Sequence, residues 1–118
     1  MKIGYVALLS LGIAIPALAE ESVKKTVDGV ELECGVTGSS NDGWSIWGTN
    51  TTVVRKECRA TCDLTDKNGK KERVTARPYP VNAKSAKTQL DANNGALKNP
   101  PYRSPVFNTA SCINKPLT

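Results

Sequence analysis

Residues 54–64, Val54-Arg55-Lys56-Glu57-Cys58-Arg59-Ala60-Thr61-Cys62-Asp63-Leu64, alternate between two kinds of side chain. Every second position from Val54 to Leu64 is apolar except Lys56, and the positions between them are charged or threonine. A period of two is typical of a β-strand that buries one face. Lys56 lies near a strand end, where we expect its long stem to carry the charge back to water. The stretch therefore predicts a half-buried strand with two cysteines on its inner face.

The residues that follow, Asp66-Lys67-Asn68-Gly69-Lys70, predict a hairpin turn. A two-residue turn at Asn68-Gly69 would place charged side chains opposite the apolar face, whereas a three-residue loop with a left-handed Gly69 keeps both faces consistent. We expect the returning strand to end near Pro78, because proline donates no backbone hydrogen bond. The cross-strand pairs predicted by this register are Cys62 with Val74, Ala60 with Ala76, Asp63 with Arg73, and Thr61 with Thr75.

Other segments have weaker patterns. An earlier strand is predicted after a turn at Asp28-Gly29, with Val30, Leu32, Cys34 and Val36 facing inward. We expect strand pieces at 44–47 and 51–54 around a break at Gly48-Thr49-Asn50, extended coil or polyproline at 99–105, and a last strand at 106–113. A short helix is predicted near residues 83–92, because Ala83, Ala86 and Leu90 would share one face after an Asn82 cap.

The four cysteines restrict the fold further. Residues four apart on a strand lie about 13 Å apart, and a disulfide needs α-carbons within about 7 Å, so Cys58 cannot bond Cys62. Two pairings remain: Cys34–Cys58 with Cys62–Cys112, or Cys34–Cys62 with Cys58–Cys112. The sequence thus predicts an all-β, mainly antiparallel protein, a small disulfide-stapled β-sandwich or open barrel.

The N-terminus has the pattern of an export signal. Lys2 precedes the apolar run Ile3–Ile15, and small residues end at Ala19, so we expect residues 1–19 to be a signal peptide and residues 20–118 a single mature β domain. The apolar run is shorter than the roughly 20 residues that span a bilayer, so no membrane span is expected in the mature chain. Periplasmic or secreted localisation follows, and there four cysteines favour disulfides.

The mature chain has few large apolar residues and a modest positive charge. Its 99 residues contain nine Val, two Ile, five Leu and one Phe, so we expect the disulfides to supply much of the stability. The formal charge falls from +5 to +4 on removal of residues 1–19, which contain one Lys and no acid. A charge of this size is ordinary for a soluble domain and argues against nucleic acid as the partner.

Little in the sequence points to catalysis. The chain has no histidine, which removes Ser-His-Asp and Cys-His arrangements and histidine zinc sites. We expect neither a metal nor a cofactor. Glu31 and Glu33 would lie about 7 Å apart on one strand face, but acids one strand step apart point the same way and do not flank a substrate. The prediction is a protein without enzymatic activity.

Binding is the remaining class of function. Trp44 and Trp47 are candidate binding residues, although Trp44 shares the parity of Ile46 and is expected in the core. Asn50 begins an Asn-Thr-Thr acceptor for N-glycosylation in an expected loop. We expect binding to an unidentified protein or envelope polymer, such as a glycan; the alternatives are a structural envelope protein without a discrete site, or an inhibitor or effector that docks through a basic hairpin. The candidate hairpin residues are Lys67, Lys70, Lys71 and Arg73.

Overall fold

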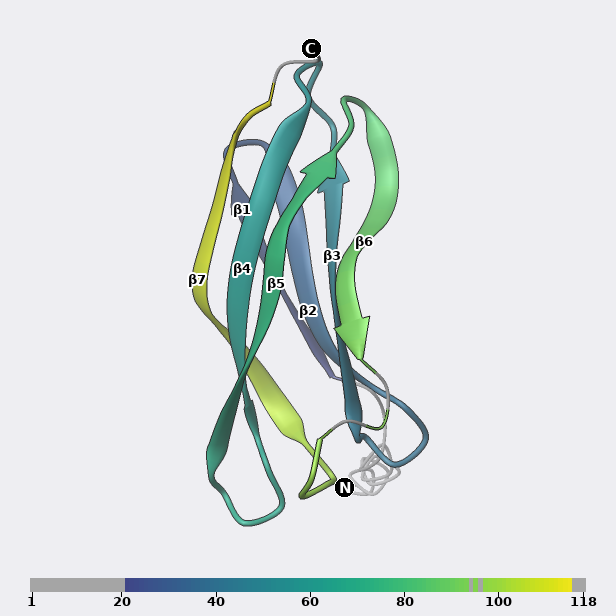
Figure 1. The fold of residues 1–118 in the computed structure, drawn as a ribbon, viewed down its shortest axis with the longest axis vertical. Coiled ribbons are helices and arrows are strands. Elements are labelled where there is room, and N and C mark those ends of the chain that lie inside the picture. The colour runs from purple at the N-terminus through teal and green to yellow at the C-terminus, as the bar shows by residue number, and fades with distance from the viewer. Residues whose placement is uncertain (1–20, 94, 96, 116–118) are drawn as a thin grey trace, which may run out of the picture.

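The computed structural model describes residues 21–93, 95 and 97–115, and this part of the chain contains seven β-strands and no helix. The strands run nearly along the long axis of the molecule, in two antiparallel sheets (Figure 1). The all-β, disulfide-stapled fold expected from the sequence is therefore confirmed. The predicted signal peptide lies outside the described residues. The strands are β1 (Ser22–Val27), β2 (Val30–Thr37), β3 (Gly43–Asn50), β4 (Lys56–Thr65), β5 (Lys71–Val81), β6 (Ser85–Asn93) and β7 (Arg103–Asn114).

The two sheets enclose one hydrophobic core. Sheet A has the strand order β1-β2-β3-β6 and sheet B the order β5-β4-β7. The inward positions predicted for β2 and β4 are buried, because each strand alternates between core and solvent. The prediction is wrong for Val54, which precedes β4 in a loop and is 39% exposed. The buried apolar side chains include Val30, Leu32, Val36 and Ile46 from sheet A, and Ala60, Leu64, Val74 and Ala76 from sheet B.

Two disulfides stabilise this core, and they do so differently. Cys34–Cys62 connects β2 to β4 and so links the two sheets, with α-carbons 6.6 Å apart. Cys58–Cys112 joins residues directly opposite each other on neighbouring strands of sheet B. This is the second of the two pairings that strand geometry leaves open. Two disulfides fit a protein outside the cytoplasm, where thiols oxidise.

The β4–β5 hairpin forms in the predicted register. All four predicted cross-strand pairs are present, and Gly69 has the expected left-handed conformation with φ of 82°. The Asp66 carboxylate accepts hydrogen bonds from the backbone N–H groups of Asn68 and Lys70, both at 2.8 Å, which fixes the turn. The predicted end near Pro78 is wrong, since β5 continues to Val81. Prolines are tolerated there because β5 is an edge strand.

The helix predicted near residues 83–92 is wrong, because Ser85–Asn93 forms strand β6. Lys84 has a φ of 49°, which is incompatible with a right-handed helix, and its N–H donates to the Thr52 carbonyl. The following residues pair with β3, and Leu90 packs into space left by Gly48. Pairing with a distant strand thus overrides a weak local helix pattern.

The segment around Asn50 also differs from the prediction. Strand β3 continues through Gly48-Thr49-Asn50, where a break was expected, and residues 51–55 form a loop where a strand piece was expected. Asn50 is fully buried, and its Nδ2 donates to the carbonyls of Val54 and Val81 while its Oδ1 accepts from Thr52. The side chain of Asn50, the last residue of β3, therefore holds the 51–55 loop in place.

The 99–105 region is more structured than the extended coil expected. Strand β7 already begins at Arg103, so the predicted 106–113 strand is longer than expected. Tyr102 is fully buried; its N–H donates to the Asn41 carbonyl and its hydroxyl donates to Glu72 at 2.7 Å. Burial is the main cause that raises the pKa of the Tyr102 hydroxyl, and the hydrogen bond to Glu72 raises it further. Tyr102 thereby links the β2–β3 loop to sheet B.

Lys56 does not return its charge to water as expected. The residue is 6% exposed, and its Nζ lies 2.9 Å from Asp28 Oδ2 and 2.8 Å from Asn114 Oδ1. Asp28 lies in the turn between β1 and β2, so the ion pair connects the two sheets at one end of the sandwich. The charge is neutralised by a residue 28 positions away, which the local pattern could not indicate.

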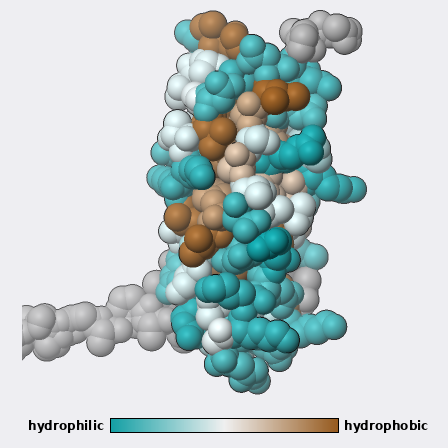
Figure 2. All heavy atoms as spheres, turned by 90° about the vertical axis from the view of Figure 1, so that its left-hand side faces the viewer, coloured by the Kyte–Doolittle hydropathy of each residue, from teal (hydrophilic) through white to brown (hydrophobic). Residues whose placement is uncertain are grey.

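Strand β1 has no counterpart among the predicted elements. It is a short, largely polar edge strand that pairs with β2, and it lies near β7, the other sheet's edge. Figure 2 views the molecule from this side and shows apolar side chains among hydrophilic ones in its upper and middle parts, with a largely hydrophilic lower end. The apolar residues of these two strands include Val23, Val27, Phe107 and Ala110, which are partly buried, and Val106 and Ile113, which are exposed.

Candidate functional site

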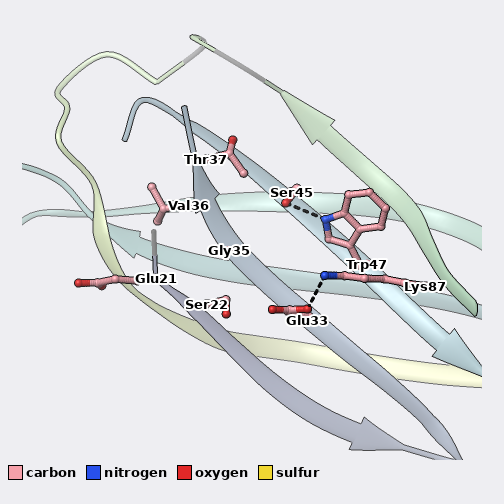
Figure 3. A pocket seen from close by; sticks show the side chains of 9 residues that line it. All are labelled: Glu21, Ser22, Glu33, Gly35, Val36, Thr37, Ser45, Trp47 and Lys87. Atoms are coloured by element: carbon pink, nitrogen blue, oxygen red, sulfur yellow. Dashed lines mark hydrogen bonds and ion pairs between the residues drawn. The ribbon is translucent and has the colours of Figure 1, made fainter. Parts of the chain in front are cut away.

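A hollow of about 350 Å³ lies on the outer face of sheet A, beside Trp47. We call it the Trp47 hollow. Its wall contains Trp47, Lys87 and Glu33, and Figure 3 shows these three side chains grouped on one side. The remaining lining residues are Glu21, Ser22, Gly35, Val36, Thr37 and Ser45.

The register of sheet A explains why a hollow forms here. Gly35 of β2 lies opposite Ser45 of β3, and this row of small residues forms a low floor. In the next outward row, Glu33 lies opposite Trp47, and these larger side chains form a wall. Because outward residues recur every two positions, a small row beside a large row produces a step in the sheet surface.

The Trp47 ring is held by two polar neighbours. Its Nε1 donates a hydrogen bond to Ser45 Oγ at 2.9 Å, and the Nζ of Lys87 lies 5.2 Å from the ring centroid. An ammonium group at this distance from an indole face makes a cation–π contact. Trp47 is only partly buried, so it is an oriented aromatic ring with some surface in the hollow.

Two of the three charged residues that line the hollow, Lys87 and Glu33, neutralise each other, and the third, Glu21, accepts a hydrogen bond from the Ser104 N–H. Lys87 Nζ lies 2.9 Å from Glu33 Oε1, and the Glu33 side chain is only 19% exposed. The bond from Lys87 lowers the pKa of the Glu33 carboxyl, burial opposes this shift, and Ser22 adds a second bond that lowers the pKa. Glu33 is therefore a bound carboxylate at neutral pH and is not poised to donate a proton.

Glu31 and Glu33, the two acids on one face of β2, lie near different cations. Glu31 is exposed and lies 4.0 Å from Lys24, whereas Glu33 binds Lys87. Each carboxylate thus faces a different cation. The described residues contain no group of three or more His, Cys, Asp or Glu placed to hold a metal ion.

The two tryptophans have different environments. Trp44 is 8% exposed and belongs to the core, as its shared parity with Ile46 indicated. Trp47 faces the other side of sheet A and lines the hollow. The alternation of β3 was sufficient to separate the two rings.

The basic hairpin residues do not form part of the Trp47 hollow. Lys67, Lys70, Lys71 and Arg73 are exposed in or beside the β4–β5 turn, at the lower end of Figure 1. Arg73 is not a free charge, because its Nε and one terminal nitrogen donate to the Asp63 carboxylate at 2.8 and 3.2 Å. That bidentate bond lowers the pKa of Asp63.

The glycosylation motif at Asn50 falls at a buried position. Its Nδ2, the atom to which a glycan would be attached, donates two hydrogen bonds to backbone carbonyls. A glycan on this nitrogen is incompatible with the folded structure.

Sequence reasoning missed Ser45, Glu33 and Lys87 as neighbours of Trp47. Ser45 could have been found, since it lies two positions from Trp47 on the same strand face. Glu33 was assigned correctly to the outer face, but its partner could not be identified. Lys87 was expected on a helix, so its approach to Trp47 depended on the β3–β6 pairing that the sequence pattern did not indicate.

In the part of the chain that the structure describes, no helix has the length and apolar character needed to cross a bilayer. Comparisons of the chain with protein-family models, curated proteins and solved structures found no match.

Proposed function

We propose that this chain is a periplasmic or secreted binding protein without enzymatic activity, and that the Trp47 hollow accepts a neutral, hydroxyl-rich ligand of the glycan class. The observation that carries the proposal is the oriented Trp47 ring beside a hollow in which Lys87, the cation next to the ring, is already paired with Glu33. An aromatic face supplies apolar contact area at low entropic cost, and its fixed orientation reduces the ordering needed on binding.

The polar groups around Trp47 favour a hydroxylated ligand over a charged one. The Glu33–Lys87 pair can accept and donate hydrogen bonds without presenting a net charge. Serine and threonine side chains also line the hollow, at Ser22, Thr37 and Ser45. A volume of about 350 Å³ lies near the lower end of the range for small-ligand sites. A hollow of this size suits one end of a polymer or a short oligosaccharide.

The test is calorimetric titration of the mature protein with cello-, chito- and malto-oligosaccharides. We expect binding of at least one series, and Trp47→Ala should weaken it about tenfold or more, since about 1.4 kcal/mol of contact energy corresponds to that factor. Tyr79→Ala is the matched control, because Tyr79 is 43% exposed but lies on sheet B. Absence of binding by the wild type, or equal affinity of Trp47→Ala, would refute the proposal.

A second candidate function is docking of a protein partner through the basic hairpin. The observation that favours it is the order of the turn, where Asp66 binds two backbone N–H groups and the Lys67 N–H donates to the Asn99 carbonyl. Pull-down from envelope extract with Trp47→Ala, and with Lys67→Glu combined with Lys70→Glu, separates the two functions. Loss of the captured partner in the lysine variant alone favours the hairpin, and absence of any partner favours a structural role.

A further inference from the structure

A second depression, of about 270 Å³, lies on the outer face of sheet B. Two arginines line it, Arg59 from β4 and Arg77 from β5, and both are exposed. Three lining residues carry hydroxyl groups, namely Thr61, Thr75 and Thr109. None of these five residues lines the Trp47 hollow, which lies on the other sheet.

A bulge brings the two arginines together. Cys58 pairs with Tyr79 and Ala60 pairs with Ala76, so Arg59 alone is opposed by both Arg77 and Pro78. A bulge of this kind leaves an extra residue on one strand and redirects a side chain. Like charges on facing positions of neighbouring strands are destabilising. The fold therefore tolerates an unfavourable arrangement at this position.

The acids of the same face do not compensate these charges. Asp63 binds Arg73, and Glu57 lies 3.0 Å from Lys115, so both carboxylates are already engaged. Asp91 and Arg77 line a neighbouring depression together, but no ion pair joins them. Within the described residues, neither Arg59 nor Arg77 has an acidic partner within 4.0 Å.

The threonines place hydroxyl groups beside the two cations. The Thr61 hydroxyl donates to Asn108 Oδ1 at 3.2 Å and shares a hydrogen bond of 2.8 Å with Thr109 Oγ1, so a ligand would replace these bonds, and Thr75 lies opposite Thr61 on β5. Hydroxyls can rotate to donate toward a ligand, whereas a guanidinium presents a planar set of N–H donors. Both are donors suited to the oxygens of a tetrahedral anion.

We propose that Arg59, Arg77 and the threonines around them form a binding site for a phosphate or sulfate group, either free or carried on a polymer. The bound anion would neutralise the facing guanidinium groups. This site is independent of the proposed glycan site, since the two share no residue and lie on opposite sheets.

The test is a titration of the mature protein, followed by amide NMR at constant ionic strength, with sodium phosphate and with a heparin-derived hexasaccharide. The variant is Arg59→Gln combined with Arg77→Gln. The matched control is Lys67→Gln combined with Lys70→Gln, which removes the same two charges at the hairpin turn. Thermal unfolding of both variants verifies that they fold, and we expect the arginine variant to melt at or above the wild-type temperature because the like charges are removed.

We expect shifts centred on β4 and β5 around the bulge, and a loss of affinity of about tenfold or more in the arginine variant only. Shifts with both probes mean that the free anion suffices, whereas shifts with the hexasaccharide alone mean that a polymer-borne group is required. The proposal is overturned if neither probe binds, if the arginine variant binds as the wild type does, or if the lysine control loses as much affinity.

Discussion

The outer faces of sheets A and B differ in how their charges are satisfied. On sheet A, Lys87 binds Glu33 and contacts the Trp47 ring, so the two charges beside the ring are paired within the protein. On sheet B, the acids Asp63 and Glu57 bind other cations, and no acid among the described residues forms an ion pair with Arg59 or Arg77. A face with paired charges suits an uncharged ligand, and a face with unpaired arginines suits an anion.

The two faces also differ in how they are built. The Trp47 hollow arises from regular pairing, in which a row of small residues lies beside a row of large ones. The arginine depression arises from an irregularity, because a bulge places two β5 residues opposite one β4 residue. A surface feature can thus come from side-chain size in a regular sheet or from a break in its register.

The largest effect on stability should come from removing Cys34–Cys62, the disulfide that links sheet A to sheet B. Cys34→Ala with Cys62→Ala should lower the free energy of unfolding by about 3–4 kcal/mol, since the bond closes a loop of 28 residues. Guanidinium denaturation measures this. Removing Cys58–Cys112, which stays within sheet B, should cost a similar amount through its longer loop of 54 residues. A loss below about 1 kcal/mol for the first pair would contradict the prediction.

A smaller effect should distinguish the hydroxyl groups of the two faces. Ser45→Ala leaves the Trp47 Nε1 without its partner and should cost about 1 kcal/mol, because Ser45 is only 8% exposed. Thr61→Val on sheet B should change the free energy of unfolding by less than about 0.5 kcal/mol, because its hydroxyl bonds are exposed. Urea denaturation of both variants measures the difference, and equal costs would show that Ser45 does not orient Trp47.

The ion pair on sheet A should contribute a still smaller, pH-dependent amount. The folded protein lowers the pKa of Glu33 from its ordinary value of 4.5, so the contribution is present above that pH and is lost as the pH falls through the lower folded value. At pH 7, Glu33→Gln should lower the free energy of unfolding by less than about 1 kcal/mol, and this difference should vanish in acid.

Thermal unfolding between neutral and acidic pH measures this contribution. Glu31→Gln is the control, because the Glu31 carboxylate lies 4.0 Å from Lys24 and both side chains are about half exposed. A difference in unfolding temperature between wild type and Glu33→Gln that does not change with pH would show that the Glu33–Lys87 ion pair does not contribute as predicted.

Iodide quenching of tryptophan fluorescence tests which face of sheet A each ring occupies. In Trp44→Phe the remaining ring, Trp47, should be quenched, because it is partly exposed on the outer face. In Trp47→Phe the remaining ring, Trp44, should be protected, because it is 8% exposed in the core. Full protection of both rings would remove the basis of the proposed glycan site.

Local sequence patterns were sufficient to predict the β4–β5 hairpin, but they did not predict the edge strands β1 and β6. The β4–β5 register followed from matching both faces across a left-handed Gly69, and every predicted pair is present. The edge strands β1 and β6 have weak alternation, and they form because β2 and β3 offer unpaired backbone groups. A helix was consequently expected where β6 lies.

Periodicity and cysteine spacing established the all-β class, the inner faces of β2 and β4, and the exclusion of a Cys58–Cys62 bond, because these depend on neighbours along one strand. Long-range packing chose between the two disulfide pairings and brought Lys87 to Trp47, Asp28 to Lys56 and Arg77 to Arg59. These contacts join residues that are distant in sequence, and their partners are decided by strand order and register. Both candidate sites belong to this second group, since each is made of side chains from different strands.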